Sequence, residues 1–456
     1  MSAIDDVLKY IATNEIRWID LQFFDINGML HKTTISNRKI EEESFGKGVY
    51  ASDLREVFGP SPQGDLALLP DPDTMARLPW EPNTVRFICD VVIAQSGERF
   101  VKDSRYVAER VDTNLEAAGM KICKVGTQME CYIFDTVTTD RTAPGRGTGT
   151  VVDSREAAWG PSPLSSMKKG AWLSQPYDSM YSARTQISET MEDSFGMSVD
   201  THTHGRSATG QQLFELSEKP MKTAADAVTT LKFVTRNLSN AVNASSTFMP
   251  YPVEGEKGNA MNIAVSLWKA ADNNIFYDAK DEYAQLGQSG YYFIGGLLEH
   301  AAALTLFTAP TPNSYRRLAI DPPVVGWSSS VQNALVRVPN NKKNMKDAKR
   351  VVYAGADPSA NAYLGIAMVV AAGLDGIKSK IEPGDPLESD KKGKRAPKPL
   401  PTSLYAAMEA LESDNKFIKG VVPSEMLGDY LDMKLEEHKR SMKAIPGYEL
   451  EKYYNI

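Results

Sequence analysis

Apolar and polar residues alternate at short intervals along the first hundred positions. Residues 17–24, RWIDLQFF, alternate polar and apolar side chains, as is typical of a strand with one buried face. Residues 25–28 end in Asn-Gly, a pair that adopts positive φ at low cost, and so predict a turn into a return strand over 29–36. With a further strand over 85–93, residues 1–105 are expected to form a small β-rich domain with a helix or two.

Beyond residue 105 the apolar period lengthens in several segments and indicates helices. The segments with this pattern are 106–119, 182–195, 225–242 and 360–379. Residues 121–134, KICKVGTQMECYIF, and 258–268, GNAMNIAVSLW, instead predict strands. Side chains two apart along a strand point the same way, so Gln128 and Glu130 are expected to share a face of the first strand.

Polar and ionisable residues are concentrated in one stretch of the chain. Residues 199–216, VDTHTHGRSATGQQLFEL, hold two of the five histidines in the chain, His202 and His204. In an extended segment these two side chains share a face, which would suit a ligand or metal site at a strand end. A zinc-type site needs three or four ligands, so two partly buried, hydrogen-bonded histidines at a strand edge are the alternative.

Composition narrows the class of protein. The chain has 456 residues, with 42% apolar and 24% charged side chains, as in ordinary globular proteins. A net charge of −7 argues against a nucleic-acid partner. The three cysteines form no CxxC pair, which favours a cytoplasmic location without disulfides.

The apolar run 291–308 is interrupted by Glu299 and His300, which predicts a buried helix and no membrane span. The charged run 385–399 is expected to be a solvated loop.

Several segments, taken in order, resemble the glutamine synthetase family over nearly the whole chain. The segment IRWIDLQFFDINGMLH is similar to the family's opening strands, and TFMPYPVEGEKGNAMNIAVSLW to its F-M-x-K-P…N-G-S-G-M-H-x-H-x-S-L text. The other matching segments are 68–80, 309–318, 356–364, 372–386, 400–411, 430–438 and 448–454. Their common order makes the resemblance specific.

The resemblance implies an α+β fold. An N-terminal β-grasp domain, residues 1–105, would precede a catalytic-type domain, residues 106–456, built on an antiparallel sheet with flanking helices. It implies a homo-oligomer of two stacked hexameric rings with each active site between neighbouring subunits. The implied reaction is phosphorylation of the γ-carboxylate of glutamate by ATP, followed by displacement of phosphate by ammonia, with Mg²⁺ or Mn²⁺ as cofactors.

The family's metal ligands are five carboxylates and one histidine. The resemblance places them on Gln128, Glu130, Gly205, Leu213, Asn262 and Val352. Only Glu130 is a carboxylate, whereas Mg²⁺ and Mn²⁺ prefer about six hard oxygen ligands. Moving the register by two would bring Glu215 near the Leu213 place, but it would break the match at Gly210 and Gln211. We therefore expect no tightly bound divalent metal or other cofactor.

Other functional positions are partly kept. The ammonium-site aspartate of the family falls on Tyr50, a phosphate-binding arginine on Gln332, and the flap glutamate at best on Asp321. The retained recognition residues are Arg317, which binds the substrate carboxylate in the family, and Arg337, Arg350, Gln211 and Ser266. For each of these the alternative is a structural ion pair or a hydrogen bond in the core.

Three hypotheses follow. The leading one is a ring-forming protein without glutamate–ammonia ligase activity, a pseudoenzyme with a structural role or a small-molecule-sensing role in the remnant cleft. The second is a metal-independent enzyme in the same cleft, with His202 and His204 as acid–base groups. The third is an active or diverged ATP-dependent glutamate–amine ligase.

Overall fold

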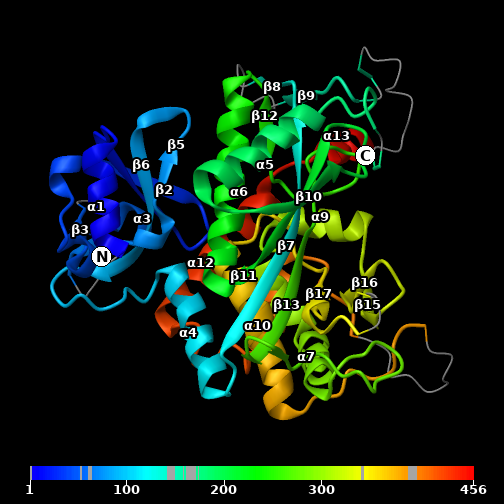
Figure 1. Ribbon diagram of the computed structural model, residues 1–456. Coiled ribbons are helices and arrows are strands. Elements are labelled where there is room, and N and C mark those ends of the chain that lie inside the picture. The colour runs from blue at the N-terminus through cyan, green and yellow to red at the C-terminus, as the bar shows by residue number, and fades with distance from the viewer. Residues whose placement is uncertain are drawn as a thin grey trace.

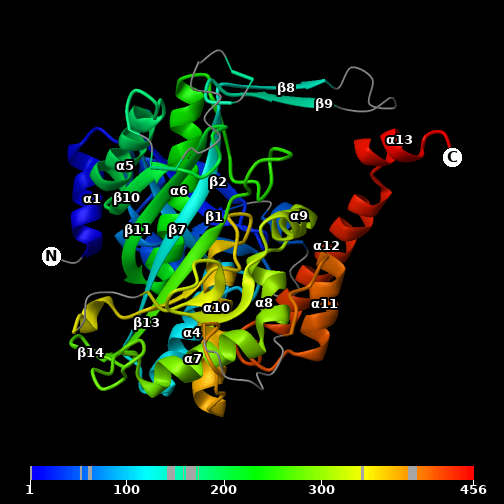
Figure 2. The same ribbon diagram turned by 90° about the vertical axis from the view of Figure 1, so that its right-hand side faces the viewer.

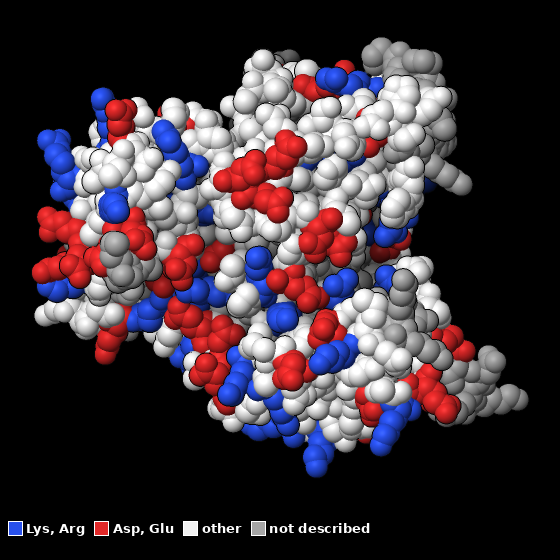
Figure 3. Space-filling view, viewed as in Figure 1, with Lys and Arg blue, Asp and Glu red and all other residues white. Residues whose placement is uncertain are grey.

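The computed structural model describes residues 3–51, 54–59, 64–140, 149–157, 159–160, 171–172, 174–339, 344–388 and 398–456. Most of the predicted loop 385–399 lies outside these residues. The N-terminal part forms a separate lobe beside the larger one, with the helix α1 (Ala3–Thr13) on its outside (Figure 1). Acidic and basic side chains are interspersed over the face shown in Figure 3.

The N-terminal lobe is a β-grasp-like sheet with strand order β2-β1-β6-β4-β3. Its strands are β1 (Trp18–Phe24), β2 (Leu30–Ser36), β3 (Val49–Tyr50), β4 (Leu66–Pro70), β5 (Ala76–Leu78) and β6 (Glu81–Ile93). The short helices α2 (Ser44–Lys47) and α3 (Arg55–Phe58) lie between strands. The predicted β1–β2 hairpin is confirmed, and Ile19, Leu21 and Phe87 fill the core of this lobe.

The larger lobe is organised around a sheet with the order β10-β11-β7-β13-β17-β16-β15. Its strands are β7 (Ile122–Phe134), β10 (Val199–His204), β11 (Gln211–Pro220), β13 (Met261–Ala270), β15 (Val324–Ser328), β16 (Ala334–Arg337) and β17 (Val351–Tyr353), with β12 (Ser245–Thr247) and β14 (Asn273–Asn274) at its sides. The expected antiparallel pairing holds except between β15 and β16, which are parallel. A separate hairpin, β8 (Thr136–Asp140) with β9 (Gly149–Asp153), projects from the body (Figure 2).

Most of the helices in this lobe pack around the sheet and contribute to the core, whereas the last one, α13 (Gly447–Tyr453), has no buried residues. The helices are α4 (Ser104–Ala117), α5 (Tyr181–Phe195), α6 (Met221–Ala241), α7 (Gln288–Glu299), α8 (Ala301–Thr308), α9 (Pro312–Ile320), α10 (Ala362–Ser379), α11 (Leu404–Ser413), α12 (Ser424–Lys443) and α13. The helix α6 packs against β7 and β11. Apolar side chains of β7, including Val125 and Met129, are buried in the same core, so the alternate positions of β7 face away from it.

The helix α10 is the central helix of the core. Its N-terminus is capped by Asn361, whose side chain accepts hydrogen bonds from the backbone N–H groups of Tyr363 and Leu364. It is long and apolar enough to span a membrane by length and composition, but 72% of its span lies buried within the protein. It packs against α4, α6, α7 and α8, as expected of a core helix.

The apolar run 291–308 is divided between two helices, so the prediction of a single buried helix was wrong. His300 separates α7 from α8. Its ring nitrogens lie 3.0 Å from a carboxylate oxygen of Asp375 and 2.8 Å from one of Asp414. Both aspartates are more than 70 residues away along the chain, so the local pattern carries no sign of the break.

A buried arginine joins the two lobes. The Arg105 side chain on α4 donates hydrogen bonds to Asp90 (2.5 Å) and Asp71 (3.0 Å) of the N-terminal lobe and to Asp226 (3.0 Å) on α6. The Tyr363 hydroxyl donates a further hydrogen bond to Asp226 over 2.6 Å. The predicted domain division at residue 105 stays a prediction, and it falls at this junction.

Candidate active site

The register of the large sheet brings most of the predicted ligand positions onto one side. Gln128 on β7 lies opposite Asn262 on β13 and Glu215 on β11, and Glu130 lies opposite Leu213. Directly opposed residues of antiparallel strands point to the same face. We call this side the site face, and it carries Gln128, Glu130, Leu213, Glu215, Asn262, Ala264, Arg337 and Val352.

The two histidines lie on the other side of the sheet. His202 and His204 share a face, as predicted, but they oppose Phe214 and Gln212, which alternate with the site-face residues. The His204 Nε2 atom is 2.9 Å from a carboxylate oxygen of Glu156. Burial lowers the pKa of His204, but its bonds to Glu156 outweigh burial and raise that pKa overall. The fold therefore does not bring these histidines together with Glu130.

The residues at the remaining ligand positions do not fit a divalent metal cluster. The Asn262 amide donates to the Gln128 side-chain oxygen over 2.9 Å, so these two neutral groups satisfy each other. Leu213 and Val352 carry only hydrocarbon. A Cβ atom at Gly205 would lie 2.5 Å from Cγ of Gln211, which leaves no room there for a liganding side chain. Within the described ranges, no three His, Cys, Asp or Glu side chains could hold a metal ion.

Glu130 faces a small cavity lined by positive charge. The cavity measures about 30 Å³ and is lined by Glu130, Arg206, Lys257, Gly258, Ala260, Arg317 and Asp321. The Glu130 carboxylate is buried and accepts a hydrogen bond from the backbone N–H of Ala260 over 2.8 Å. Burial raises the pKa of Glu130, although Ala260, Arg206 and Arg317 act in the opposite direction. Glu130 is thus a carboxylate held among cations of the chain.

Arg317 forms the buried wall of this cavity. It lies near the C-terminal end of α9, is 5% exposed, and donates to the carbonyl oxygen of Gly355 over 3.0 Å. A Cβ atom at Gly258 would lie 2.5 Å from Cγ of Arg317, so a glycine lets the arginine reach this place. The Nε atom of Arg317 is buried and has no hydrogen-bond partner among the described residues.

Asp321 closes the cavity from outside. Its carboxylate lies 3.3 Å from the Lys257 ammonium and 3.9 Å from the Arg206 guanidinium. The sequence had placed Asp321 and Arg317 in the site, and the fold brings them to the same cavity. It had not identified Arg206 and Lys257. Their only signal was position, since Arg206 follows the ligand position 205 and Lys257 lies just before the strand with Asn262.

A second charged group lies farther along the site face. The Arg350 guanidinium is 3.0 Å from a carboxylate oxygen of Glu218 and 3.6 Å from one of Glu215. Glu215 reaches the site face without any shift of register, because it opposes Gln128 directly. Arg337, whose Cα position opposes Val352, has its pKa lowered by burial. Arg337 and Arg350 thus supply positive charge to this part of the site face.

Gln211 and Ser266 make internal hydrogen bonds. The Gln211 side chain accepts from the Ser207 backbone N–H over 2.9 Å and donates to the Gly258 carbonyl oxygen over 3.1 Å. The Ser266 hydroxyl accepts a hydrogen bond from the Trp268 indole over 2.9 Å. These contacts fit the structural alternative, and a ligand contact by either residue stays a prediction.

Two descriptions of protein families match this chain. "Glutamine synthetase, catalytic domain" matches residues 101–453, and "Glutamine synthetase, beta-Grasp domain" matches residues 15–94.

The chain belongs to the glutamine synthetase family.

The similarity to curated family members extends over the full length. A glutamine synthetase of Sulfolobus acidocaldarius is 38% identical over 448 residues, which covers 95% of this chain and 94% of the relative. One from Rhizobium meliloti is 32% identical over 483 residues and covers all of both chains. The cryo-EM structure of Plasmodium falciparum glutamine synthetase superposes with a TM-score of 0.89 at 22% identity, covering 100% of this chain and 99% of the other, and so supports the fold.

These relatives contradict the leading hypothesis from the sequence. The alignments with proteins named glutamine synthetase cover 95% and 100% of the chain, at 38% and 32% identity, so the prediction of a pseudoenzyme without ligase activity was wrong. That prediction treated metal ligands as the only source of charge compensation in the cleft. Arg206, Lys257 and Arg317 bring positive charge to the cavity beside Glu130, and Arg350 lies farther along the site face. Membership of the family also supports assembly into a homo-oligomer.

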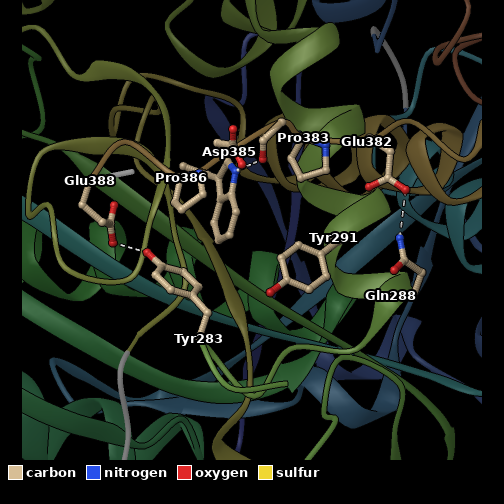
Figure 4. A pocket seen from close by; sticks show the side chains of 10 residues that line it. Tyr283, Gln288, Tyr291, Glu382, Pro383, Asp385, Pro386 and Glu388 are labelled. Atoms are coloured by element: carbon tan, nitrogen blue, oxygen red, sulfur yellow. Dashed lines mark hydrogen bonds between the residues drawn. The ribbon is translucent and has the colours of Figure 1, made fainter. Parts of the chain in front are cut away.

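A larger cavity lies elsewhere. It has a volume of about 750 Å³ and is lined by Tyr283, Gln288, Tyr291, Trp327, Glu382, Pro383, Gly384, Asp385, Pro386 and Glu388 (Figure 4). The Glu388 carboxylate accepts a hydrogen bond from the Tyr283 hydroxyl, and the Gln288 amide donates one to the Glu382 carboxylate over 3.1 Å. This cavity borders β15 at the edge of the sheet, and its lining includes none of the site-face residues.

Proposed function

We propose that this protein is an ATP-dependent ligase that joins the side-chain carboxylate of glutamate to ammonia or to another amine. The observation that carries the proposal is the similarity to the Sulfolobus acidocaldarius glutamine synthetase, at 38% identity over 95% of the chain. The retained Arg317 beside Glu130 supports it, because a guanidinium can bind a carboxylate through two hydrogen bonds.

The proposed reaction has two steps. A carboxylate oxygen of glutamate attacks the γ-phosphorus of ATP and releases ADP, which leaves an acyl phosphate. The amine nitrogen then bonds to the carbonyl carbon, the C–O electron pair leaves with inorganic phosphate, and the nitrogen loses a proton. Arg317 would hold the substrate α-carboxylate, while Arg337 and Arg350 on the far part of the site would face the phosphates. Asp321 remains the candidate for the flap carboxylate.

The test is an assay of the full chain with glutamate, ATP supplied as its magnesium complex, and one amine at a time. The panel should contain ammonia, methylamine, ethanolamine and putrescine, because the ammonium-site position is Tyr50, which is exposed. We expect phosphate release together with an amide product for at least one amine. Phosphate release without an amide, or no turnover with any amine, would contradict the proposal.

Arg317→Gln tests the role of the retained arginine. Since a carboxylate held by a guanidinium loses its charged partner in this variant, KM for glutamate should rise about tenfold or more, equivalent to about 1.4 kcal/mol. KM for ATP should change much less. A matched control is Arg316→Gln, the neighbouring arginine that does not line the cavity. Equal kinetics for both variants would exclude Arg317 as the carboxylate-binding residue.

We further propose two stacked hexameric rings in the cytoplasm. The β8–β9 hairpin and the C-terminal segment with α13 project from the body (Figure 2). They expose apolar side chains, including Val151, Ile445 and Leu450. Exposed apolar surface on projecting elements favours contact with another subunit. The three cysteines are free and buried, which suits a reducing compartment.

A further inference from the structure

We infer that Arg206, Lys257 and Arg317 form a binding site for a carboxylate or phosphate group that needs no divalent metal, and that the Asp321 carboxylate occupies this site when no ligand is bound. We call these three residues the cation cluster. The inference deepens the proposed function, because the anion would belong to a substrate, but it can be tested by binding alone.

The first argument is charge. Three cations and two carboxylates, Glu130 and Asp321, line the cavity, so its formal charge is +1 with both carboxylates ionised. If Asp321 moves away, Glu130 is the only carboxylate left in the lining, and the formal charge of the lining residues becomes +2. An incoming oxyanion would restore the balance that Asp321 now provides. Opposite charges at these distances in partly buried surroundings attract far more strongly than they do in bulk water.

The second argument is the buried arginine. Arg317 is 5% exposed, lines the cavity, and keeps a buried Nε atom without a hydrogen-bond partner among the described residues. A buried donor without a partner costs free energy, and native structures contain few of them. The nearest carboxylate oxygen of Asp357, which is also buried and without a hydrogen-bond partner among the described residues, is 3.8 Å from this Nε atom. Arg317 itself lines the cavity, so an oxyanion bound there would lie beside a guanidinium whose hydrogen-bonding capacity is not filled.

The third argument is the exposure of the side chains at the entrance. The side chains of Asp321, Lys257 and Arg206 are 43%, 45% and 66% exposed, so they can move without disturbing the core. The present cavity of about 30 Å³ has room for about one water molecule. An oxyanion therefore enters only when Asp321 is displaced. Arg317 stays fixed by Gly355 and provides the rigid part of the site.

Anion binding in this cavity is expected to need no divalent metal, because the residues at the neighbouring ligand positions cannot hold one. Gly205 has no room for a side chain, and Leu213 offers no oxygen, so Glu130 is the only carboxylate that remains of those three ligand positions. A guanidinium carries its charge at any working pH and presents several donors to an oxyanion. Arg206, one residue after position 205, thus delivers positive charge beside the position where the family has a metal ligand.

The experiment measures binding by calorimetry to the full chain, without ATP or amine. Glutamate and inorganic phosphate are titrated separately, each with excess EDTA and again with Mg²⁺. We expect one or both anions to bind, with a Kd that changes by less than about twofold between the two conditions. The anion that binds more tightly identifies whether the site takes a carboxylate or a phosphate group.

Variants test the two halves of the inference. Arg206→Gln should raise the Kd about fivefold or more, because it removes one of three cations. Asp321→Asn should lower the Kd about threefold or more, because it removes the internal competitor. Arg55→Gln and Asp65→Asn are matched controls, since Arg55 and Asp65 form an exposed ion pair in the other lobe. These controls should bind like the unmodified chain.

Several outcomes would overturn the inference. They are binding that disappears in EDTA, no measurable binding of either anion, an Arg206→Gln variant that binds normally, or an Asp321→Asn variant that binds no more tightly. Metal-independent binding without ligase turnover would support this inference and contradict the proposed function instead. Turnover with strictly metal-dependent anion binding would do the reverse.

Discussion

At the scale of single residues, the direction of each side chain on β7 decides what the cleft contains. Glu130 is the buried carboxylate of the site face, and it sits beside Arg206 and Arg317. Burial raises its pKa, so its charged form is less favourable in the folded chain than in the unfolded chain. Glu130 therefore costs stability at any pH where it is forced to ionise.

This predicts the behaviour of Glu130→Gln. A carboxyl whose folded pKa is raised contributes stability below its unfolded pKa and loses it as the pH rises through the folded pKa. The variant should be more stable than the unmodified chain at pH 8, and this advantage should shrink toward pH 4.5. Urea unfolding at the two pH values measures the difference. A variant equally or less stable at pH 8 would contradict the expectation.

Some of these residues could be predicted from the sequence, and others could not. The shared face of Gln128 and Glu130 follows from the period of a strand, and it is confirmed. Arg206, Lys257 and Asp321 come from three separate segments, so only the tertiary fold places their charges together. Motif matching assigned Leu213 and rejected Glu215, whereas a period of two puts both on the same face.

At the scale of elements, the break between α7 and α8 is stabilised by one histidine. Burial lowers the pKa of His300, but its hydrogen bonds to Asp414 and Asp375 outweigh burial and raise that pKa overall. The local sequence predicted a continuous helix because the two aspartates lie far along the chain. The hairpin β1–β2 needed no such partner, since its turn residues are local, and it was predicted correctly.

His300→Gln should therefore show a pH-dependent loss of stability. A histidine whose folded pKa is raised contributes stability that is present below its unfolded pKa of about 6.5 and is lost as the pH rises through the folded value. We expect the melting temperature of the variant to fall further below that of the unmodified chain at pH 5.5 than at pH 8.5. His438→Gln, at a half-buried position of α12, serves as the control. A deficit that does not depend on pH would exclude this mechanism.

The junction between the lobes makes the second prediction at this scale. Arg105→Ala leaves the buried Asp226 without its guanidinium, whereas Asp90 keeps its ion pair with Arg99. Breaking a buried ion pair on one side costs about 3–5 kcal/mol. The denaturant midpoint should fall accordingly. Arg110→Ala, which removes a hydrogen bond to Gly420 on the exposed side of the same helix, should cost far less. Similar losses for both variants would contradict the role assigned to Arg105.

At the scale of the whole molecule, the projecting segments predict the assembly. Two stacked hexamers of the 50.2 kDa chain would have a mass of about 600 kDa. Removing residues 445–456 deletes exposed apolar side chains of the C-terminal helix and should yield smaller particles. Mass photometry measures both, with Val242→Ser, an exposed apolar residue elsewhere, as the control. An unchanged mass after the truncation would show that this helix makes no essential subunit contact.

The Arg105 junction also has a consequence for the order of events during synthesis. Asp71 and Asp90 precede Arg105 in the chain, whereas Asp226 follows it by 121 residues. At about 5–20 residues per second, a ribosome needs about 6–24 s to deliver that last partner. Asp71 and Asp90 can therefore form their ion pairs with Arg105 before Asp226 has been synthesised. When Asp226 has been synthesised, the larger lobe can fold against an arginine that two carboxylates already hold. The positions of these residues in the sequence therefore favour folding of the N-terminal lobe before the larger lobe.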